Sequence, residues 1–201
     1  MVSELAAGEY HTEAAYLPNG IDPSFYPKRG GICRKNSDSD RGDCSAEHKN
    51  VDESFRIVEQ LDLEKFEIWY MSYNGNPKSW YRVDRFLHRV PYEKTPEVYA
   101  ACDILLKTSL LESFSYPPLE MMASGGYVVA VPNGGNLEYL KDGENCILYP
   151  QGNLAEAKAA IERILTDAEL RKKLDTGAEE TVKERNWKRI EPQILEQYLG
   201  K

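Results

Sequence analysis

Two short apolar segments constrain the fold of this chain more than any other feature. Residues 103–107 hold three consecutive aliphatic side chains, and residues 127–131 are apolar throughout. Strands that are apolar on both faces are typical of parallel sheets covered by helices on both sides. Around these two segments the sequence predicts further strands at 66–71 and 85–88, and helices at 96–102 and 119–124. This alternation predicts an α/β fold with a parallel sheet flanked by helices.

The two ends of the chain differ in what they can bury. After Asn153, apolar residues recur at helical spacing in three stretches, which predicts three core-facing helices, and residues 51–61 predict another. Residues 28–48 carry mixed charges and small polar side chains, with almost nothing to bury. We expect this segment to be irregular or disordered.

Composition excludes several classes of protein. Twenty-five Lys and Arg face 33 Asp and Glu, so the net charge is −8, which is unsuited to binding nucleic acid. The length of 201 residues fits one domain, 1–201, and no apolar run approaches the roughly 20 residues that span a bilayer. No secretory signal pattern opens the sequence, so we expect a cytoplasmic protein. The spacing of the four cysteines and three histidines matches no metal site.

The stretch from Glu112 to Glu120 is the most informative for chemistry. Glu112 follows the buried strand at 103–107, and Glu120 lies in the first turn of the next helix. Ligands of open α/β sheets bind at the carboxyl ends of the strands, and N–H groups near 113–116 favour a phosphate. A carboxylate beside them can accept hydrogen bonds from a sugar or ribose, which together suits a nucleotide-diphosphate sugar. The alternative is structural, with Glu120 favoured only by its helix N-terminus and Glu112 an exposed loop acid.

The stretch and its flanks resemble the group 1, or family four, glycosyltransferases of the GT-B fold. Glu112 and Glu120 match the E-x7-E motif of that family. Three further segments match in the family's order: Pro18-Asn19-Gly20-Ile21-Asp22 with Phe25 and Pro27, residues 98–109, and Leu119-Glu120-Met121-Met122-Ala123-Ser124-Gly125 with its following strand. Gly134-Gly135-Asn136 and Asp142-Gly143-Glu144-Asn145 resemble the segment after it.

The resemblance implies a Rossmann-like domain, the C-terminal, donor-binding half of a retaining glycosyltransferase. Glu112, as the catalytic residue, would lie near a hydroxyl of the donor sugar, and Glu120 would bind the ribose. Ser113, Phe114, Ser115 and Tyr116 would hold the sugar and diphosphate. Lys49 falls where the family has a lysine for the diphosphate, and Arg89 and Val90 would lie beside the nucleobase. No metal or cofactor is expected.

Departures from the family limit what the resemblance implies. The first strand of this half has no apolar counterpart in residues 28–48, so we expect it to be missing or degenerate, and the usual diphosphate arginine is unassigned. Lys107 could replace it, or could simply be a lysine at a strand end. The N-terminal acceptor-binding domain is also expected to be absent, so the isolated chain would not be fully active.

These features define the expected partners and the competing interpretations. The parent enzyme would take a nucleotide sugar, build cell-surface polysaccharide and associate peripherally with a membrane, without nucleic acid. A non-catalytic Rossmann-like binding or structural module is the alternative, favoured by the charged 28–48 segment. A phosphatase or dehydrogenase lacks support, because no P-loop, dinucleotide or nucleophile-elbow motif is present. Aromatic residues around 69–81 are interpreted as sheet packing rather than a binding surface.

Overall fold

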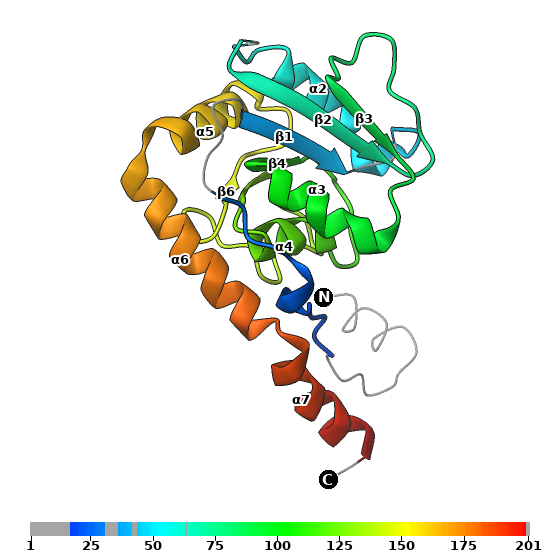
Figure 1. Ribbon diagram of the computed structural model, residues 1–201, viewed down its shortest axis with the longest axis vertical. Coiled ribbons are helices and arrows are strands. Elements are labelled where there is room, and N and C mark those ends of the chain that lie inside the picture. Colours follow the sequence, from blue (N-terminus) through cyan, green and yellow to red (C-terminus); the bar gives the residue numbers. More distant parts are fainter. Residues whose placement is uncertain (1–16, 31–35, 42–43, 63, 200–201) are drawn as a thin grey trace.

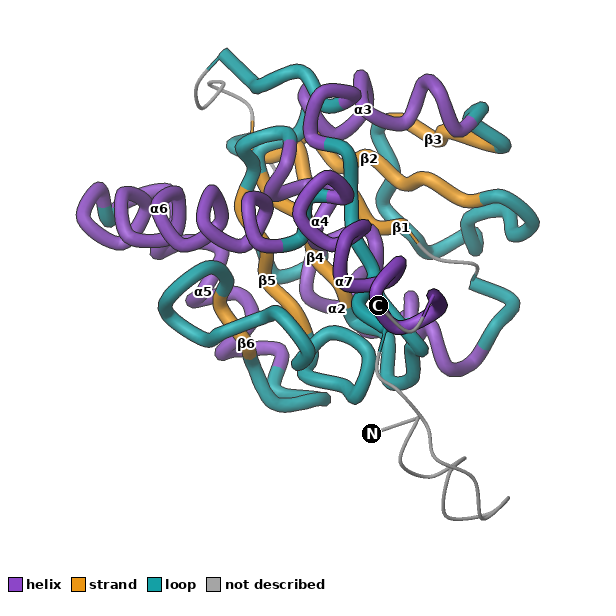
Figure 2. Tube along the Cα trace, turned by 90° about the horizontal axis from the view of Figure 1, so that it is seen from below, coloured by secondary structure: helices purple, strands orange, loops and turns teal. Residues whose placement is uncertain are grey.

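A six-stranded parallel sheet forms the centre of the molecule (Figure 1). The computed structural model describes residues 17–30, 36–41, 44–62 and 64–199. The strand order is β3-β2-β1-β4-β5-β6, and Figure 2 shows this row from one edge to the other. The strands are β1 (Asn36–Arg41), β2 (Phe66–Ser72), β3 (Arg85–His88), β4 (Ile104–Lys107), β5 (Tyr127–Ala130) and β6 (Ile147–Leu148).

Helices cover both faces of the sheet, where the side chains of β4 and β5 are buried on both sides. Ile104 and Leu106 of β4 pack in one cluster with α2 (Val51–Val58) and α5 (Leu154–Thr166). Leu105 packs on the other face with α3 (Thr95–Ala101) and α4 (Tyr116–Ala123). The long helix α6 (Ala168–Glu184) lies against α4 and α5, and α7 (Trp187–Leu199) extends away from the sheet (Figure 1). Three short 3-10 helices complete the described elements: η1 (Pro23–Phe25), η2 (Glu47–Lys49) and η3 (Tyr92–Lys94).

The predicted α/β fold with a parallel, helix-flanked sheet is confirmed. The four predicted strands appear as β2 to β5, and the predicted helices appear as α2 to α7 with ends shifted by a few residues. Strand β6 lies at the edge of the sheet and is only two residues long, too short for a periodic pattern to identify it. Helical periodicity, and strands that are apolar on both faces, therefore predict the positions of most helices and strands.

The expectation that residues 28–48 are irregular or disordered is wrong for the middle of this segment. Residues 36–41 form β1, which pairs with β2 over its whole length and with β4 at Asp38 and Ser39. The first strand is therefore present, between β2 and β4, although its sequence is Asn-Ser-Asp-Ser-Asp-Arg. A parallel ladder is built from main-chain N–H and C=O groups, which every one of these residues supplies. A search for apolar runs does not detect such a strand.

The strand order creates a crevice between β1 and β4. The chain leaves β1 toward β2 on one side, whereas β4 and β5 continue on the other, so their connections diverge at the carboxyl ends. Ligands of open α/β sheets bind at such a switch point. Lys49 follows β1 and Glu112 follows β4, so the fold brings these two parts of the chain to the same edge. No helix among the described residues is long and apolar enough to cross a membrane.

Candidate functional site

A pocket of about 860 Å³ opens at this edge of the sheet. Its volume lies in the range of small-molecule sites. Its lining comes from the segment around η1, Lys49 after β1, the end of β2, η3, the β4–α4 region and the start of α7. Charged and aromatic side chains dominate the lining, which includes Asp22, Phe25, Tyr26, Lys49, Tyr73, Tyr92, Lys107, Glu112, Phe114, Tyr116, Glu120 and Trp187.

Two lysines converge on one glutamate in this pocket. The Lys49 ammonium donates to both carboxylate oxygens of Glu112 at 2.9 Å, and Lys107 Nζ lies 3.3 Å from Glu112 Oε1. Lys107 is only 1% exposed and also donates to the Ser109 hydroxyl. A buried ammonium is tolerated when it is paired and hydrogen-bonded in this way. We call Lys49, Glu112 and Lys107 the charged triad; its charges sum to +1.

The triad fixes the charge state of its carboxylate. Burial alone would raise the pKa of Glu112, but the positive charges of Lys107 and Lys49 outweigh it, so the pKa lies below its ordinary value. Glu112 is therefore ionised at neutral pH. With two cations and one anion held together, the triad retains net positive charge and favours an anionic group beside it.

Hydrogen bonds join the loops that carry the triad. The Thr108 hydroxyl donates to the Asn50 carbonyl at 2.9 Å, and the Leu110 N–H donates to the His48 carbonyl at 2.8 Å. The Asn133 amide donates to the Ser109 carbonyl at 2.8 Å, which ties in the loop after β5. The ends of three strands are thus connected, and the triad sits on a support that is organised before any ligand arrives.

Gly135 shows how closely these loops approach. A Cβ atom placed there would lie 2.3 Å from the Glu112 carbonyl oxygen and 2.7 Å from its carbonyl carbon. Both are main-chain atoms that cannot rotate away. The glycine is therefore required by the close approach of two backbones, and through that approach it helps to fix the position of Glu112.

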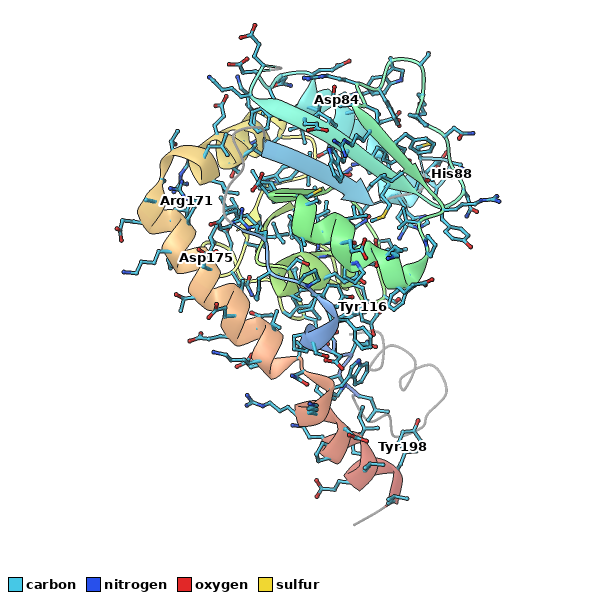
Figure 3. The ribbon with its side chains drawn as sticks, in the orientation of Figure 1. Asp84, His88, Tyr116, Arg171, Asp175 and Tyr198 are labelled. Atoms are coloured by element: carbon cyan, nitrogen blue, oxygen red, sulfur yellow. The ribbon has the colours of Figure 1, made fainter. Side chains whose placement is uncertain are left out.

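Glu120 lies on the other side of the pocket, in α4. It is 1% exposed and accepts a hydrogen bond of 3.0 Å from the Tyr26 hydroxyl. Helix α4 begins at Tyr116 and has prolines at its next two positions, which fit the first turn because their missing N–H groups have no helical partner there. Figure 3 shows Tyr116 on the side of α4 that faces η1, and its hydroxyl lies 3.3 Å from Asn19 Oδ1.

Most of the residues predicted for the site are brought together. Six line the pocket: Lys49, Lys107, Glu112, Phe114, Tyr116 and Glu120. The structural alternative for Glu112 as an exposed loop acid is wrong, because its side chain is 13% exposed and bound by two lysines.

Four predicted residues do not line the pocket. Ser113 is exposed to solvent, and Ser115 is buried, with a hydroxyl that has no hydrogen-bond partner among the described residues. Val90 packs against the core below α4. Arg89 is exposed, and its Nε donates to the Tyr73 carbonyl at 3.3 Å. Because Tyr73 itself lines the pocket, Arg89 borders the site without forming its wall.

The sequence does not single out several aromatic residues of the pocket, namely Tyr26, Tyr73, Tyr92 and Trp187. Tyr26 directly follows Phe25 in the Pro18–Pro27 motif, and this position is a signal by which it could be found. Tyr73 was assigned to sheet packing, which holds for the buried Tyr70 and Tyr81, but Tyr73 is 67% exposed and lines the pocket. Trp187, at the start of α7, comes from the far end of the chain.

The part of the chain that the structure describes contains no cluster of three or more His, Cys, Asp or Glu side chains that could hold a metal. The polar groups of the pocket include two ammonium groups, three carboxylates and several tyrosine hydroxyls. This set can bind an anion and accept hydrogen bonds from hydroxyl groups.

Comparisons with known proteins agree with this arrangement. The model of the family "Glycosyl transferases group 1" matches residues 84–181, which include β4, α4 and both glutamates. The O-antigen biosynthesis protein RfbC of Myxococcus xanthus is 35% identical over 117 residues, or 57% of this chain and 9% of RfbC.

Solved structures show the same fold. Anabaena HepE, in complex with UDP-glucose, superposes on 98% of this chain with a TM-score of 0.82 at 20% identity, and this chain covers 61% of it. The C-terminal domain of the group 1 glycosyl transferase LpcC from Francisella tularensis has a TM-score of 0.65 at 20% identity, over 82% of this chain and 97% of that domain. This chain thus spans only part of the RfbC and HepE chains that it matches. Residues 84–181 therefore match the group 1 glycosyl transferase family, and the chain around them has the fold of HepE and of the LpcC domain.

Proposed function

We propose that the chain is the donor-binding domain of a retaining glycosyltransferase, which transfers a sugar from a nucleotide-diphosphate sugar to a glycan or similar acceptor. The charged triad carries this proposal, because it places net positive charge in the same pocket as the buried carboxylate of Glu120. The UDP-glucose bound to Anabaena HepE, which shares the fold, supports a nucleotide sugar as the ligand.

Each part of the donor has a matching group. The ammonium groups of Lys49 and Lys107 bind the diphosphate, and the carboxylate of Glu120 accepts hydrogen bonds from the ribose hydroxyls. Glu112, between the two lysines, accepts a hydrogen bond from a hydroxyl of the transferred sugar. The backbone of residues 113–116 and the rings of Phe114 and Tyr116 enclose the sugar and diphosphate.

The nucleobase lies beside Arg89 and Val90 in this proposal. Tyr73 joins them, since its ring lies 6.0 Å from the Arg89 guanidinium and lines the pocket. Tyr73 is largely exposed and lies at the pocket wall, and such a ring is suited to stacking on a base.

Transfer requires stabilisation of the leaving nucleoside diphosphate. As the bond between the sugar and the diphosphate breaks, negative charge builds up on the phosphate oxygens. Lys107 and Lys49 are held in place before the reaction, so they stabilise that charge without reorganising. Donor binding by these lysines, without a metal or cofactor, stays a prediction.

The acceptor is bound by an N-terminal domain of the parent protein, so the isolated chain should bind the donor but transfer no sugar. We propose a role in cell-surface polysaccharide synthesis at the cytoplasmic side of a membrane, with peripheral association. The name of RfbC, an O-antigen biosynthesis protein, supports that role.

Calorimetric titration of the chain with UDP, GDP and ADP, and with their glucose conjugates, tests the proposal. We expect the nucleotides of one base to bind with a Kd in the micromolar range. Glu120→Gln should weaken that binding about tenfold, because a charge-assisted hydrogen bond to the ribose is lost. Glu53→Gln is the matched control, since Glu53 is also buried but does not line the pocket. If none of these nucleotides binds, or both variants weaken binding equally, the proposal is wrong.

The alternative interpretation, a non-catalytic binding or structural module, is no longer supported by the feature that favoured it. That interpretation depended on a sheet without its first strand, whereas β1 is present and pairs on both sides. We therefore retain donor binding as the single proposed function.

A further inference from the structure

A segment from Asn19 to Arg29 crosses the pocket side of α4 and is anchored at both ends. At one end, the Ile21 N–H donates to the Arg185 carbonyl at 2.7 Å, and the Trp187 N–H donates to the Ile21 carbonyl at 3.1 Å. At the other end, the Arg29 N–H donates to the Ser124 carbonyl at 2.9 Å, and its guanidinium pairs with Asp103 at 2.8 Å. The segment between these anchors is held across the helix.

Tyr26 lies in this segment, and its side chain reaches Glu120. Its ring is 6% exposed and packs in the core cluster below α4, while its hydroxyl donates to Glu120 Oε1 at 3.0 Å. Burial, and then the negative charge of Glu120, raise the pKa of Tyr26 well above its ordinary value. The hydroxyl therefore remains protonated and acts as a donor throughout the physiological range. Both residues line the pocket.

We infer that Tyr26 is a positioning residue, which orients the Glu120 carboxylate toward the ribose diol of the nucleotide. This inference rests on the proposed function. A glutamate has several rotatable bonds, and a hydrogen bond to one oxygen restricts them before the ligand arrives. A ligand hydroxyl then meets a carboxylate in one orientation, so less conformational entropy is lost on binding.

Because the segment is anchored at both ends, the Tyr26 hydroxyl is held in a fixed position relative to Glu120. Two main-chain hydrogen bonds at one end and an ion pair that is 9% and 3% exposed at the other fix where its hydroxyl lies. Affinity for the ribose should therefore depend on a residue 94 positions away from Glu120 in the sequence.

Ribose selectivity separates this role from a merely structural one. We would titrate the wild type with UDP, GDP and ADP, and then with the 2′,3′-dideoxy form of whichever binds. Tyr26→Phe keeps the ring and removes only the hydroxyl. We expect it to weaken binding of the ribonucleotide about three- to tenfold and to leave binding of the dideoxynucleotide unchanged, because that ligand has no hydroxyl for Glu120.

A double-mutant cycle with Glu120→Gln completes the test. If Tyr26 acts through Glu120, the double variant should bind the ribonucleotide no more weakly than Glu120→Gln alone. Tyr81→Phe is the matched control, because it removes a similar hydroxyl, which donates to the carboxylate of Asp52 outside the pocket. It should bind both nucleotides as the wild type does.

The possible failures are distinguishable. If Glu120→Gln weakens ribonucleotide binding but Tyr26→Phe does not, the positioning role is wrong and donor binding stands. If Tyr26→Phe weakens binding of both nucleotides equally, its effect is structural and the inference is again overturned. If the wild type binds no ribonucleotide, the proposed function fails and the inference fails with it.

Discussion

Neutralising Glu112 should strengthen binding of a nucleoside diphosphate and weaken the preference for its sugar conjugate. Glu112→Gln removes the negative charge that lies between two ammonium groups, so the net charge of the triad changes from +1 to +2. A diphosphate then meets two lysines that no longer share the negative charge of Glu112. The transferred sugar, in contrast, loses a charged acceptor for its hydroxyl.

The charges of the triad determine two quantities: the change in affinity for UDP and the cost in folding stability. One unit charge about 6 Å from a phosphate oxygen is worth about 3 kcal/mol at an effective dielectric constant of about 20. Solvent at the open pocket reduces this to about 1.5 kcal/mol, or roughly tenfold tighter binding of UDP. Breaking a fully buried ion pair costs about 3–5 kcal/mol of folding stability. For Glu112→Gln we expect a loss of about 2–3 kcal/mol, because the Lys49 side chain is 27% exposed and water can solvate its ammonium group.

Calorimetry with UDP and UDP-glucose, together with chemical denaturation, measures these quantities. Glu138→Gln is the matched control, since it breaks a 2.6 Å ion pair with Arg185 outside the pocket and should leave both affinities unchanged. A folded Glu112→Gln protein that binds UDP no more tightly than the wild type would refute the reasoning, because the lysines would then not be the diphosphate site.

The pH dependence of stability follows from the same triad. The folded-state pKa of Glu112 lies below its ordinary value of 4.5, so the ionised carboxylate stabilises the fold above that pH. This stabilisation is lost as the pH falls from about 4.5 through the folded-state pKa. The wild type should therefore lose more stability than Glu112→Gln between pH 5 and pH 3, in denaturation curves recorded at each pH.

Three further predictions concern the support of the site and the sheet. Gly135→Ala should lower the melting temperature and weaken UDP binding, since its Cβ would lie 2.3 Å from the Glu112 carbonyl oxygen and displace it; unchanged thermal scans and titrations would contradict this. Burial raises the pKa of Asp175, so its ionisation as the pH rises from about 4 destabilises the fold, and Asp175→Asn should remove this loss from melting curves recorded between pH 4 and pH 7. Amides of residues 36–41 should be protected in hydrogen exchange, because β1 pairs with strands on both sides, and free exchange would argue against the strand.

The sequence predicts those parts of the fold in which side chains carry the information. Residues 104–106 and 127–130 are apolar and buried on both faces of the sheet, so their composition is sufficient to identify the two strands. Strand β1 was missed because its pairing depends on main-chain groups, which a polar sequence provides equally well.

The residues of the site also differ in how far the sequence predicts them. Glu112 and Glu120 are eight positions apart in one motif, and the resemblance of that motif to the family, rather than the spacing alone, implies that both reach one site; both line the pocket. The contact between Tyr26 and Glu120 joins residues 94 positions apart, and the Lys49–Glu112 pair joins residues 63 apart. Such contacts depend on how α4 and its neighbouring loops pack, and no local pattern in the sequence encodes that packing.

An acidic chain can bind an anionic donor because the two electrostatic effects act over different ranges. The net charge of −8 is spread over the surface, where salt screens it within about 8 Å at physiological ionic strength. The triad acts at hydrogen-bonding distance, and Lys107 is almost fully buried, so its attraction for a phosphate is screened far less. The overall charge should slow the approach of the donor, whereas the local +1 of the triad should determine its affinity. Added salt should therefore change the association rate more than the dissociation rate, and the opposite result would place the binding charge on the surface rather than in the pocket.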